Sequence, residues 1–186
     1  MTPVRSQIEG IEKLFLYYKN LGESAMAQVQ ETDLIKEPTE GINSIAIIVK
    51  HLAGNMRSRW TDFKTTDGEK ESRNRDLEFE EPMMSRTEIM QVWENGWNVL
   101  LTALKETIDA ELENMIYIRN EGHSIQDAFQ RQLAHYAYHV GQIVYLAKIY
   151  KGDHWKSLSI PKHHSKDYNQ IKFSEERQQR HFTDKV

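Results

Sequence analysis

No cysteine occurs among the 186 residues of the chain. Disulfide bonds, zinc sites built on thiolates and a cysteine nucleophile are therefore excluded. Any thiol chemistry would have to use a thiol brought in from outside. A glycine-rich phosphate loop, a Gly-x-Ser-x-Gly motif, an internal repeat and low-complexity tracts are also absent. The common signatures of nucleotide-binding proteins, serine hydrolases and repeat proteins are therefore missing.

Long apolar runs and basic clusters are absent as well. The sequence has no run of apolar residues long enough to span a membrane, and its first residues lack the apolar part of a signal peptide. We therefore expect a soluble, cytoplasmic protein without a membrane partner. The 28 acidic and 24 basic residues give a formal net charge of −4. Because no basic cluster could follow a phosphate backbone, nucleic acid is not an expected partner.

Apolar residues recur every three or four positions in four segments, which predicts four amphipathic helices and an all-α fold. The first helix is expected from about residue 4 to 30. The second is expected to begin at a cap formed by Asn43 or Ser44 and to end near Lys64.

The third and fourth helices have clear start signals. A capping box from Ser85 to Glu88 precedes the third, whose apolar stripe includes two tryptophans that we expect in the core. Ser124 is expected to cap the fourth, which should end near Tyr150 with Gly152 just beyond.

The connections between these helices are expected to be irregular. Proline and glycine mark residues 31–42 as a loop. The mostly polar segment 65–84 is expected to lack regular structure, with charges that keep it solvated. Its 20 residues could extend about 65 Å, so it could cross the length of the helices. In the ambiguous residues 107–122, Met115–Ile118 could be a strand and Asn120–His123 a turn.

The chain is expected to form one domain with a real core. Residues 1–152 would contain the four helices, and residues 153–186 would be an extension packed on them or trailing from them. This extension is too polar to form a core of its own, and its last dozen residues are expected to be disordered or loosely packed. A homodimer formed through exposed apolar residues is plausible.

Two histidines on the fourth predicted helix suggest a metal site. His135 and His139 are four residues apart, so both imidazoles leave the same side of the helix and can share one cation. At about 100° per residue, His51 lies at the same edge of the apolar stripe of its own helix as they do of theirs. The three positions suit one shared site beside the core. The alternative is that they are half-buried boundary residues, hydrogen-bonded to neighbours.

Polar residues near the three histidines are candidates for supporting or substrate contacts. Asn55 and Asp62 lie on the His51 side of the second helix, and Arg131 and Gln142 flank the pair on the fourth. No general base is evident, since Asp62 and Asp127 could be surface carboxylates. A cleft lined by Trp60, Tyr138 or Leu146 would favour an enzyme. The histidines after residue 152 are expected to be dispensable for metal: His154, His163, His164 and His181.

The order of these motifs resembles the DinB/YfiT-like superfamily of metal-binding four-helix bundles. The resemblance rests on Ile48-Val-Lys-His-Leu-Ala-Gly-Asn55, the charged segment 65–84 and His135-Tyr-Ala-Tyr-His139, and it covers about residues 4–170. The tail Trp155-Lys-Ser-Leu-Ser-Ile-Pro161, followed by Ser165 and Asn169, resembles a bacterial branch whose function is uncharacterised.

The resemblance implies an up-down-down-up four-helix bundle in which residues 65–84 are the long crossover between the second and third helices. It also implies that His51, His135 and His139 are ligands of one divalent cation. Three imidazoles suit zinc, nickel, copper or iron(II), and we expect zinc or nickel, with iron as an alternative. Several members of the superfamily are S-transferases or isomerases that use bacillithiol, mycothiol or a similar low-molecular-weight thiol. The expected partners are therefore a small-molecule thiol and an electrophilic substrate.

Other functions remain open for such a site. Three neutral imidazoles leave a metal its full charge and positions for water, which also suits hydrolysis by a metal-bound hydroxide. A bundle that binds metal, or a partner, without turnover is a further alternative.

Overall fold

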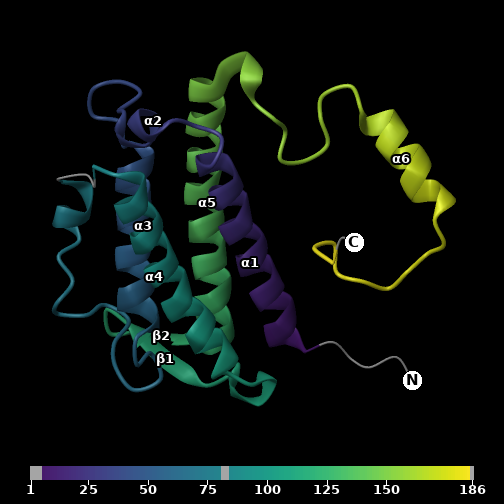
Figure 1. Cartoon of the computed structure of the whole chain (residues 1–186). Coiled ribbons are helices and arrows are strands. Elements are labelled where there is room, and N and C mark those ends of the chain that lie inside the picture. The colour runs from purple at the N-terminus through teal and green to yellow at the C-terminus, as the bar shows by residue number, and fades with distance from the viewer. Residues whose placement is uncertain (1–5, 81–83, 185–186) are drawn as a thin grey trace.

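A computed structural model describes residues 6–80 and 84–184 of the chain. Most of these residues are helical, which confirms the predicted all-α class. Four long helices lie side by side and account for most of the structure (Figure 1). They are α1 (Gln7–Met26), α3 (Ile45–Trp60), α4 (Arg86–Lys105) and α5 (Ile125–Lys151). Residues 4 and 5, where the first helix was expected to start, lie outside the described residues.

The helix ends follow the predicted local signals. The Ser44 hydroxyl accepts a hydrogen bond from the Ile47 amide at the start of α3, which decides between the two expected caps. The Ser85–Glu88 capping box is present at the start of α4. Ser124 caps α5, and Gly152 follows the helix with a φ of 56°. Because a left-handed φ favours glycine, this residue ends the helix with little strain.

Contacts at the helix ends relate the directions of α1, α3 and α4. At the start of α4, the Arg86 guanidinium donates to the carbonyl of Met26, the last residue of α1, and to that of Val29 just beyond it. Beyond the end of α3, the Lys64 ammonium donates to the carbonyl of Glu106, just after α4 ends. Helices α3 and α4 therefore run in the same direction, and the segment between them returns along their length (Figure 1).

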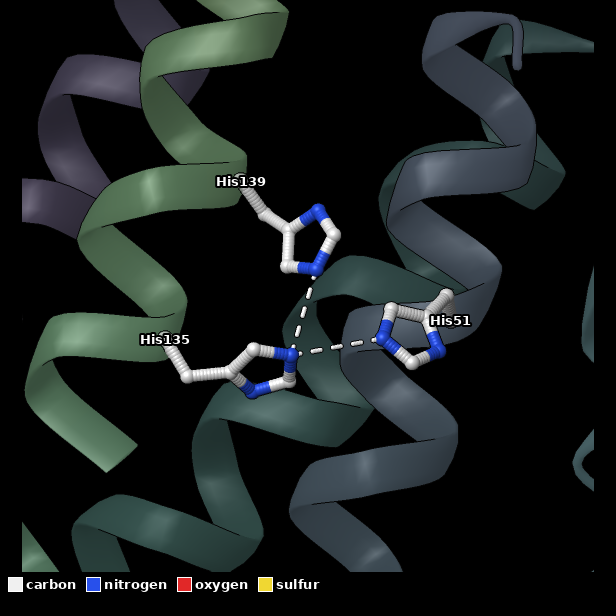
Figure 2. Close-up of side chains that lie close together, drawn as sticks. All are labelled: His51, His135 and His139. Carbon is white, nitrogen blue, oxygen red and sulfur yellow. Dashed lines mark hydrogen bonds between the residues drawn. The ribbon is translucent and has the colours of Figure 1, made fainter. Parts of the chain in front are cut away.

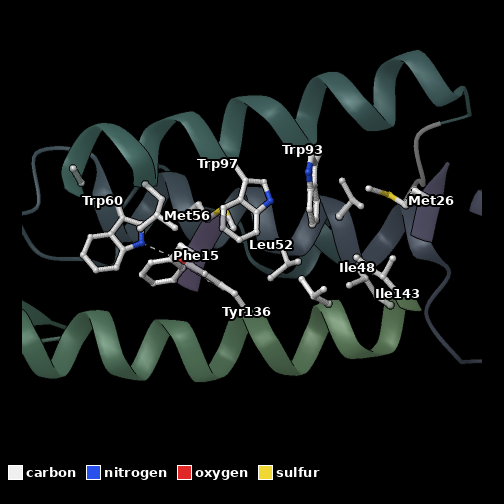
Figure 3. Close-up of a cluster of buried hydrophobic side chains, with 14 of the residues drawn as sticks. Phe15, Met26, Ile48, Leu52, Met56, Trp60, Trp93, Trp97, Tyr136 and Ile143 are labelled. Atoms are coloured by element: carbon white, nitrogen blue, oxygen red, sulfur yellow. Dashed lines mark hydrogen bonds between the residues drawn. The ribbon is translucent and has the colours of Figure 1, made fainter. Parts of the chain in front are cut away.

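The core lies between these four helices and is rich in aromatic rings (Figure 3). Trp93 and Trp97 of α4 are 1% and 0% exposed, as expected for core residues. Trp60 of α3 stacks on Phe129 of α5, with ring centroids 4.4 Å apart. Its indole N–H donates to the hydroxyl of Tyr136, so the ring is buried without leaving its polar atom unpaired.

Several connections contain more regular structure than expected. Residues Glu31–Ile35 form a short helix, α2, and Asp76–Phe79 form a 3-10 turn, η1, within the predicted irregular crossover. A second 3-10 turn, η2, covers Asp109–Glu111. The prediction that residues 31–42 and 65–84 lack regular structure was wrong, because single helical turns need only local hydrogen bonds and no long apolar stripe. The η2 turn lies in residues 107–122, for which the sequence prediction was ambiguous.

A small hairpin precedes α5. Strand β1 (Met115–Ile118) pairs antiparallel with β2 (Glu121–Ser124), so residues expected to form a turn belong to the second strand. The turn consists of Arg119 and Asn120, both with positive φ. Two left-handed residues match the twist of a two-residue hairpin, although glycine is the more usual choice there.

Beyond α5, a 3-10 turn η3 (Gly152–His154) leads to an unpredicted helix, α6 (Ser165–Ser174), which contains no buried residue. Figure 1 shows α6 beside the four long helices and not among them. Near the end of the described chain, Phe182 contacts Tyr17 of α1, with ring centroids 5.2 Å apart. None of the described helices has the length and apolar character needed to cross a membrane.

Candidate metal centre

Three histidines from two helices converge on one point, as the sequence predicted. His51 comes from α3, and His135 and His139 come from successive turns of α5 (Figure 2). The Nε2 atom of His135 lies 3.4 Å from that of His51 and 3.1 Å from that of His139. Ligands about 2.0–2.1 Å from one ion at tetrahedral or octahedral angles would be about 2.9–3.4 Å apart. The spacing therefore fits a shared ion.

The other ring nitrogens of two of these histidines are held by acceptors. His51 Nδ1 lies 2.9 Å from the Glu78 carboxylate, and His139 Nδ1 lies 3.1 Å from the amide oxygen of Gln142. An oxygen acceptor requires the proton on Nδ1, which leaves the Nε2 lone pair directed at the shared point. This is the arrangement that fixes the tautomer and the ring orientation of metal-binding histidines.

The cluster favours neutral imidazoles. Burial, followed by the proximity of His139 and His51, lowers the pKa of His135 to about 3. Burial also lowers the pKa of His139, against the opposing effect of its hydrogen bond to Gln142. Both rings are therefore unprotonated near neutral pH, and a metal ion would not have to displace a proton from either.

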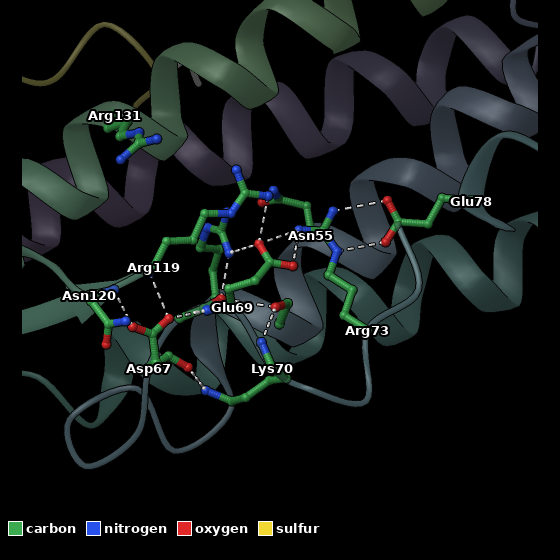
Figure 4. Close-up of polar contacts among 12 residues, drawn as sticks. Asn55, Asp67, Glu69, Lys70, Arg73, Glu78, Arg119, Asn120 and Arg131 are labelled. Atoms are coloured by element: carbon green, nitrogen blue, oxygen red, sulfur yellow. Dashed lines mark hydrogen bonds and ion pairs between the residues drawn. The ribbon is translucent and has the colours of Figure 1, made fainter. Parts of the chain in front are cut away.

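The acceptor for His51 comes from the crossover, which was expected to be solvated. Glu78 is 7% exposed, and both of its carboxylate oxygens bind Arg73, at 2.8 and 2.9 Å (Figure 4). Burial acts to raise the pKa of Glu78, but hydrogen bonds from His51 and Arg73 and the charge of Arg73 outweigh it and hold the pKa below its usual range. The carboxylate therefore remains charged although it is buried.

A second carboxylate extends this network. Glu69 binds Arg59 of α3 at 3.0 Å, Arg73 at 3.3 Å and Arg119 of the hairpin turn at 3.1 Å. The network joins the crossover, α3 and the hairpin (Figure 4). The prediction that the charges of residues 65–84 only keep the segment solvated was therefore wrong. Buried charges are tolerated here because each carboxylate has at least one guanidinium partner.

Two packing details bring the crossover close to His51. A Cβ on Gly54, one turn after His51, would lie 2.2 Å from Glu78 Oε1. Only glycine therefore leaves room for the carboxylate at this position. The ring of Phe79 packs on the His51 imidazole, with centroids 4.9 Å apart. Gly54 is the one signal in the sequence that another group approaches this face of α3.

A cavity of about 410 Å³ opens onto the three histidines. Of the polar residues suggested by the sequence, Asn55 and Arg131 line it, and Gln142 binds His139. Asp62 lines a different hollow, and Asp127 lies in the first turn of α5, so neither carboxylate is in the wall.

Of the three side chains whose presence in such a cleft would favour an enzyme, Tyr138 is in the wall. Trp60 belongs to the core, and Leu146 borders a separate apolar hollow.

The basic character of this cavity was not predicted from the sequence. Its wall contains five arginines and, among the described residues, no carboxylate. They come from α3, the crossover, the hairpin turn and α5: Arg59, Arg73, Arg75, Arg119 and Arg131. These arginines lie too far apart in the chain for their sequence spacing to group them. They come together only in the folded structure, where the crossover lies beside α3.

The histidines after α5 take no part in the cluster. His154, His163 and His164 are exposed, and His181 contacts Thr183 in its own loop. Within residues 6–80 and 84–184, His51, His135 and His139 form the one group of histidine and carboxylate side chains whose spacing could hold a metal ion.

The comparisons with known proteins assign no activity to this site. The model of one protein family, described as "Protein of unknown function (DUF1572)", matches residues 4–164. Neither the curated proteins nor the solved structures contain a match. The matched region includes all three histidines and the crossover, and it ends just before α6.

Proposed function

The chain belongs to the DUF1572 family, whose description gives no function, and we propose that it binds one divalent metal ion through His51, His135 and His139. The proposal is carried by one observation: three imidazoles converge while Glu78 and Gln142 hold the second nitrogen of two of them. A cluster of histidines that only filled space would gain nothing from directing its lone pairs at one another.

The ligand set suits several metals. Imidazole nitrogens bind zinc, nickel, copper and iron(II), and the intrinsic order of affinity does not select the ion that a cell supplies. Zinc or nickel is the expected occupant, with iron(II) as an alternative. The cavity beside the histidines supports open coordination positions, which distinguish catalytic from structural sites.

We further propose that the site transfers a low-molecular-weight thiol to an electrophilic substrate. A divalent ion on three neutral imidazoles would supply Lewis-acid chemistry and lower the pKa of a bound thiol or water. The chain has no cysteine to provide the sulfur. In the transfer, sulfur bonds to the electrophilic carbon, the leaving group departs with its bonding electrons, and the thiol proton passes to solvent. No carboxylate base is required in the wall.

Elemental analysis of the purified protein tests the metal site. We expect about one equivalent of metal per chain, which is lost when His51, His135 or His139 is replaced by alanine. The exposed His163→Ala variant is the matched control and should retain the metal. Stoichiometric metal in His135→Ala would overturn the assignment of the ligands.

The thiol reaction needs a separate assay. Bacillithiol, glutathione and cysteine would be tested with a chlorinated aromatic electrophile, using metal-loaded and chelator-stripped protein. We expect turnover only with the metal-loaded protein. Equal rates in both preparations, or no turnover with any thiol, would remove the transferase proposal and leave a metal-dependent hydrolase or a non-catalytic metal-binding protein.

We propose that α1, α3, α4 and α5 form an up-down-down-up four-helix bundle of the DinB-like type, in which residues 65–84 are the long crossover. The contacts of Arg86 and Lys64 at the helix ends support these directions. Residues 1–152 would be the bundle and residues 153–186 its extension. Formation of a homodimer would be tested by sedimentation analysis.

A further inference from the structure

The arginines of the histidine-lined cavity fall into two groups. Arg59, Arg73 and Arg119 are ion-paired with Glu69 or Glu78. Arg75 and Arg131 also line the cavity, yet within the described parts of the chain neither has a carboxylate at ion-pair distance. Since the two glutamates are shared among three guanidinium groups, the cavity retains a net positive charge near the histidines.

Arg75 is positioned by aromatic stacking. Its guanidinium lies over the ring of Phe79, 4.9 Å from the centroid. Phe79 in turn packs on His51, with ring centroids 4.9 Å apart. The Phe79 ring therefore contacts both the Arg75 guanidinium and the His51 imidazole. Stacking on a ring leaves the N–H groups of the guanidinium available to donate hydrogen bonds to a ligand.

Arg131 is positioned by α5. It lies one turn before His135, and its Nη1 atom contacts His123 Nε2 at 3.2 Å. Figure 4 shows it apart from the ion-pair network of the crossover. Both Arg75 and Arg131 are exposed at the entrance of the cavity. An incoming anion can therefore reach them without breaking an existing ion pair.

Two buried polar atoms in the same wall have no partner among the described residues: Arg59 Nε and Gln132 Oε1. Gln132 is 3% exposed. Buried polar groups are nearly always hydrogen-bonded, and an unpaired one is costly. Both atoms lie beneath the surface of the wall, so the groups that an incoming molecule can reach are the exposed guanidinium groups of Arg75 and Arg131.

We infer that this cavity binds a small molecule bearing an oxyanion, either a carboxylate or a phosphate, which Arg75 and Arg131 hold while another atom of the molecule reaches the three histidines. This inference rests on the proposed function, because it assigns the charge of the molecule that the metal centre acts on. Guanidinium groups suit both oxyanions, since their N–H donors match two oxygens at once.

Two thiols that differ mainly in charge test the inference. Cobalt(II)-loaded protein would be titrated with 3-mercaptopropionate and with the neutral 3-mercaptopropanol, following the absorption that appears when a thiolate binds cobalt. Hydrogen bonds to charged groups predict that the carboxylate thiol binds about 10- to 100-fold more tightly. Equal affinities for the two thiols would overturn the inference without affecting the metal site.

Arginine variants test whether Arg75 and Arg131 cause the preference for the carboxylate thiol. Arg75→Gln and Arg131→Gln should each reduce the affinity for 3-mercaptopropionate and leave that for 3-mercaptopropanol unchanged. Arg177→Gln, in the exposed chain after α6, is the matched control and should change neither affinity. A preference that persists in the Arg75→Gln/Arg131→Gln double variant would overturn the assignment. Competition by acetate or by inorganic phosphate would show which oxyanion the cavity favours.

Failure of the metal site would be distinguished from failure of the anion site. If the protein does not take up cobalt, the proposed function is lost, and acetate and phosphate are titrated into metal-free protein instead. Weak binding that disappears in the double arginine variant would still support the anion site. Binding that is absent, or that is independent of both arginines, would overturn it.

Discussion

Two polar segments of this chain, the crossover at residues 65–84 and the extension after Gly152, have similar compositions but very different surroundings. In the crossover, the side chains of Arg73 and Glu78 are 5% and 8% exposed, and Glu78 binds both Arg73 and His51. In the extension, α6 has no buried residue, and Phe173 is 84% exposed. Whether a polar segment is buried therefore depends on the hydrogen-bond and ion-pair partners that the neighbouring helices provide, and not on its own charge content.

Helix α3 provides two partners for the glutamates of the crossover, the His51 N–H and the Arg59 guanidinium. Gly54 leaves the space that the Glu78 carboxylate occupies. Burying an ion pair contributes little net stability, but removing one partner of a buried pair is costly. The network therefore fixes the position of the crossover more than it stabilises the fold. Helix α6 of the extension has no buried residue, and the ion pairs of the extension, such as Lys172 with Glu175 and Asp184 with Lys13, lie at the surface.

The largest difference between the two segments should appear when one glutamate in each is neutralised. Glu78→Gln leaves Arg73 without its two-oxygen partner, and we expect the free energy of unfolding to fall by about 3–5 kcal/mol. Because His51 loses its charged acceptor, the metal dissociation constant should rise about 10- to 100-fold. Urea unfolding and metal titration measure the two effects.

The matched control for Glu78→Gln is Glu175→Gln, which removes an exposed ion pair with Lys172 after α6. It should alter neither quantity. A Glu78→Gln variant that binds metal as tightly as the native chain would show that the crossover only covers the histidines and does not orient them.

A smaller effect is expected from adding one methyl group on the face of α3 that receives the crossover. In Gly54→Ala the new Cβ meets Glu78, and we expect a loss of about 1–3 kcal/mol. Gly141→Ala on α5 is the control, since its Cβ would have no neighbour within 4 Å. Alanine favours a helix by up to about 1 kcal/mol over glycine, so this control should gain stability. Stabilisation of both variants would contradict the proposed tight contact.

The smallest effect should follow removal of the exposed part of the extension. Deleting residues 165–186 removes α6 and the contacts of Phe182 with Tyr17 and of Asp184 with Lys13. These contacts are peripheral, so we expect the melting temperature to change by less than about 2 °C and the metal content to stay the same. Calorimetry and elemental analysis would check this. Loss of metal from the shortened chain would mean that the extension supports the site after all.

The parts of the structure that sequence predicted well are those set by local chemistry. Ser44, Ser124 and the Ser85–Glu88 box each act on amides a few residues away, so the helix starts could be derived from short patterns. The three histidines could be grouped because each lies at the same edge of an apolar stripe. This edge faces the boundary of the core in any compact packing of such helices.

The parts that sequence missed depend on the packed structure. Glu78 lies in a charged segment whose pattern resembles any solvated loop, and its contact with His51 forms only when that segment packs against α3. The short helices α2 and α6 have too few turns to give a clear periodicity. Gly54 was visible in the sequence, but a helical glycine does not reveal which group approaches it.

The distance along the chain between the proposed ligands has a consequence for synthesis. His51 and His135 are 84 residues apart, so His51 leaves the ribosome long before the pair on α5 exists. An ion that needs all three imidazoles can bind only after α5 has docked, and it then stabilises the completed fold by mass action, by about 2.7 kcal/mol at a hundredfold excess over its dissociation constant. Metal would thus be bound only by fully folded molecules, and a shortage of metal would reduce the amount of protein that survives degradation.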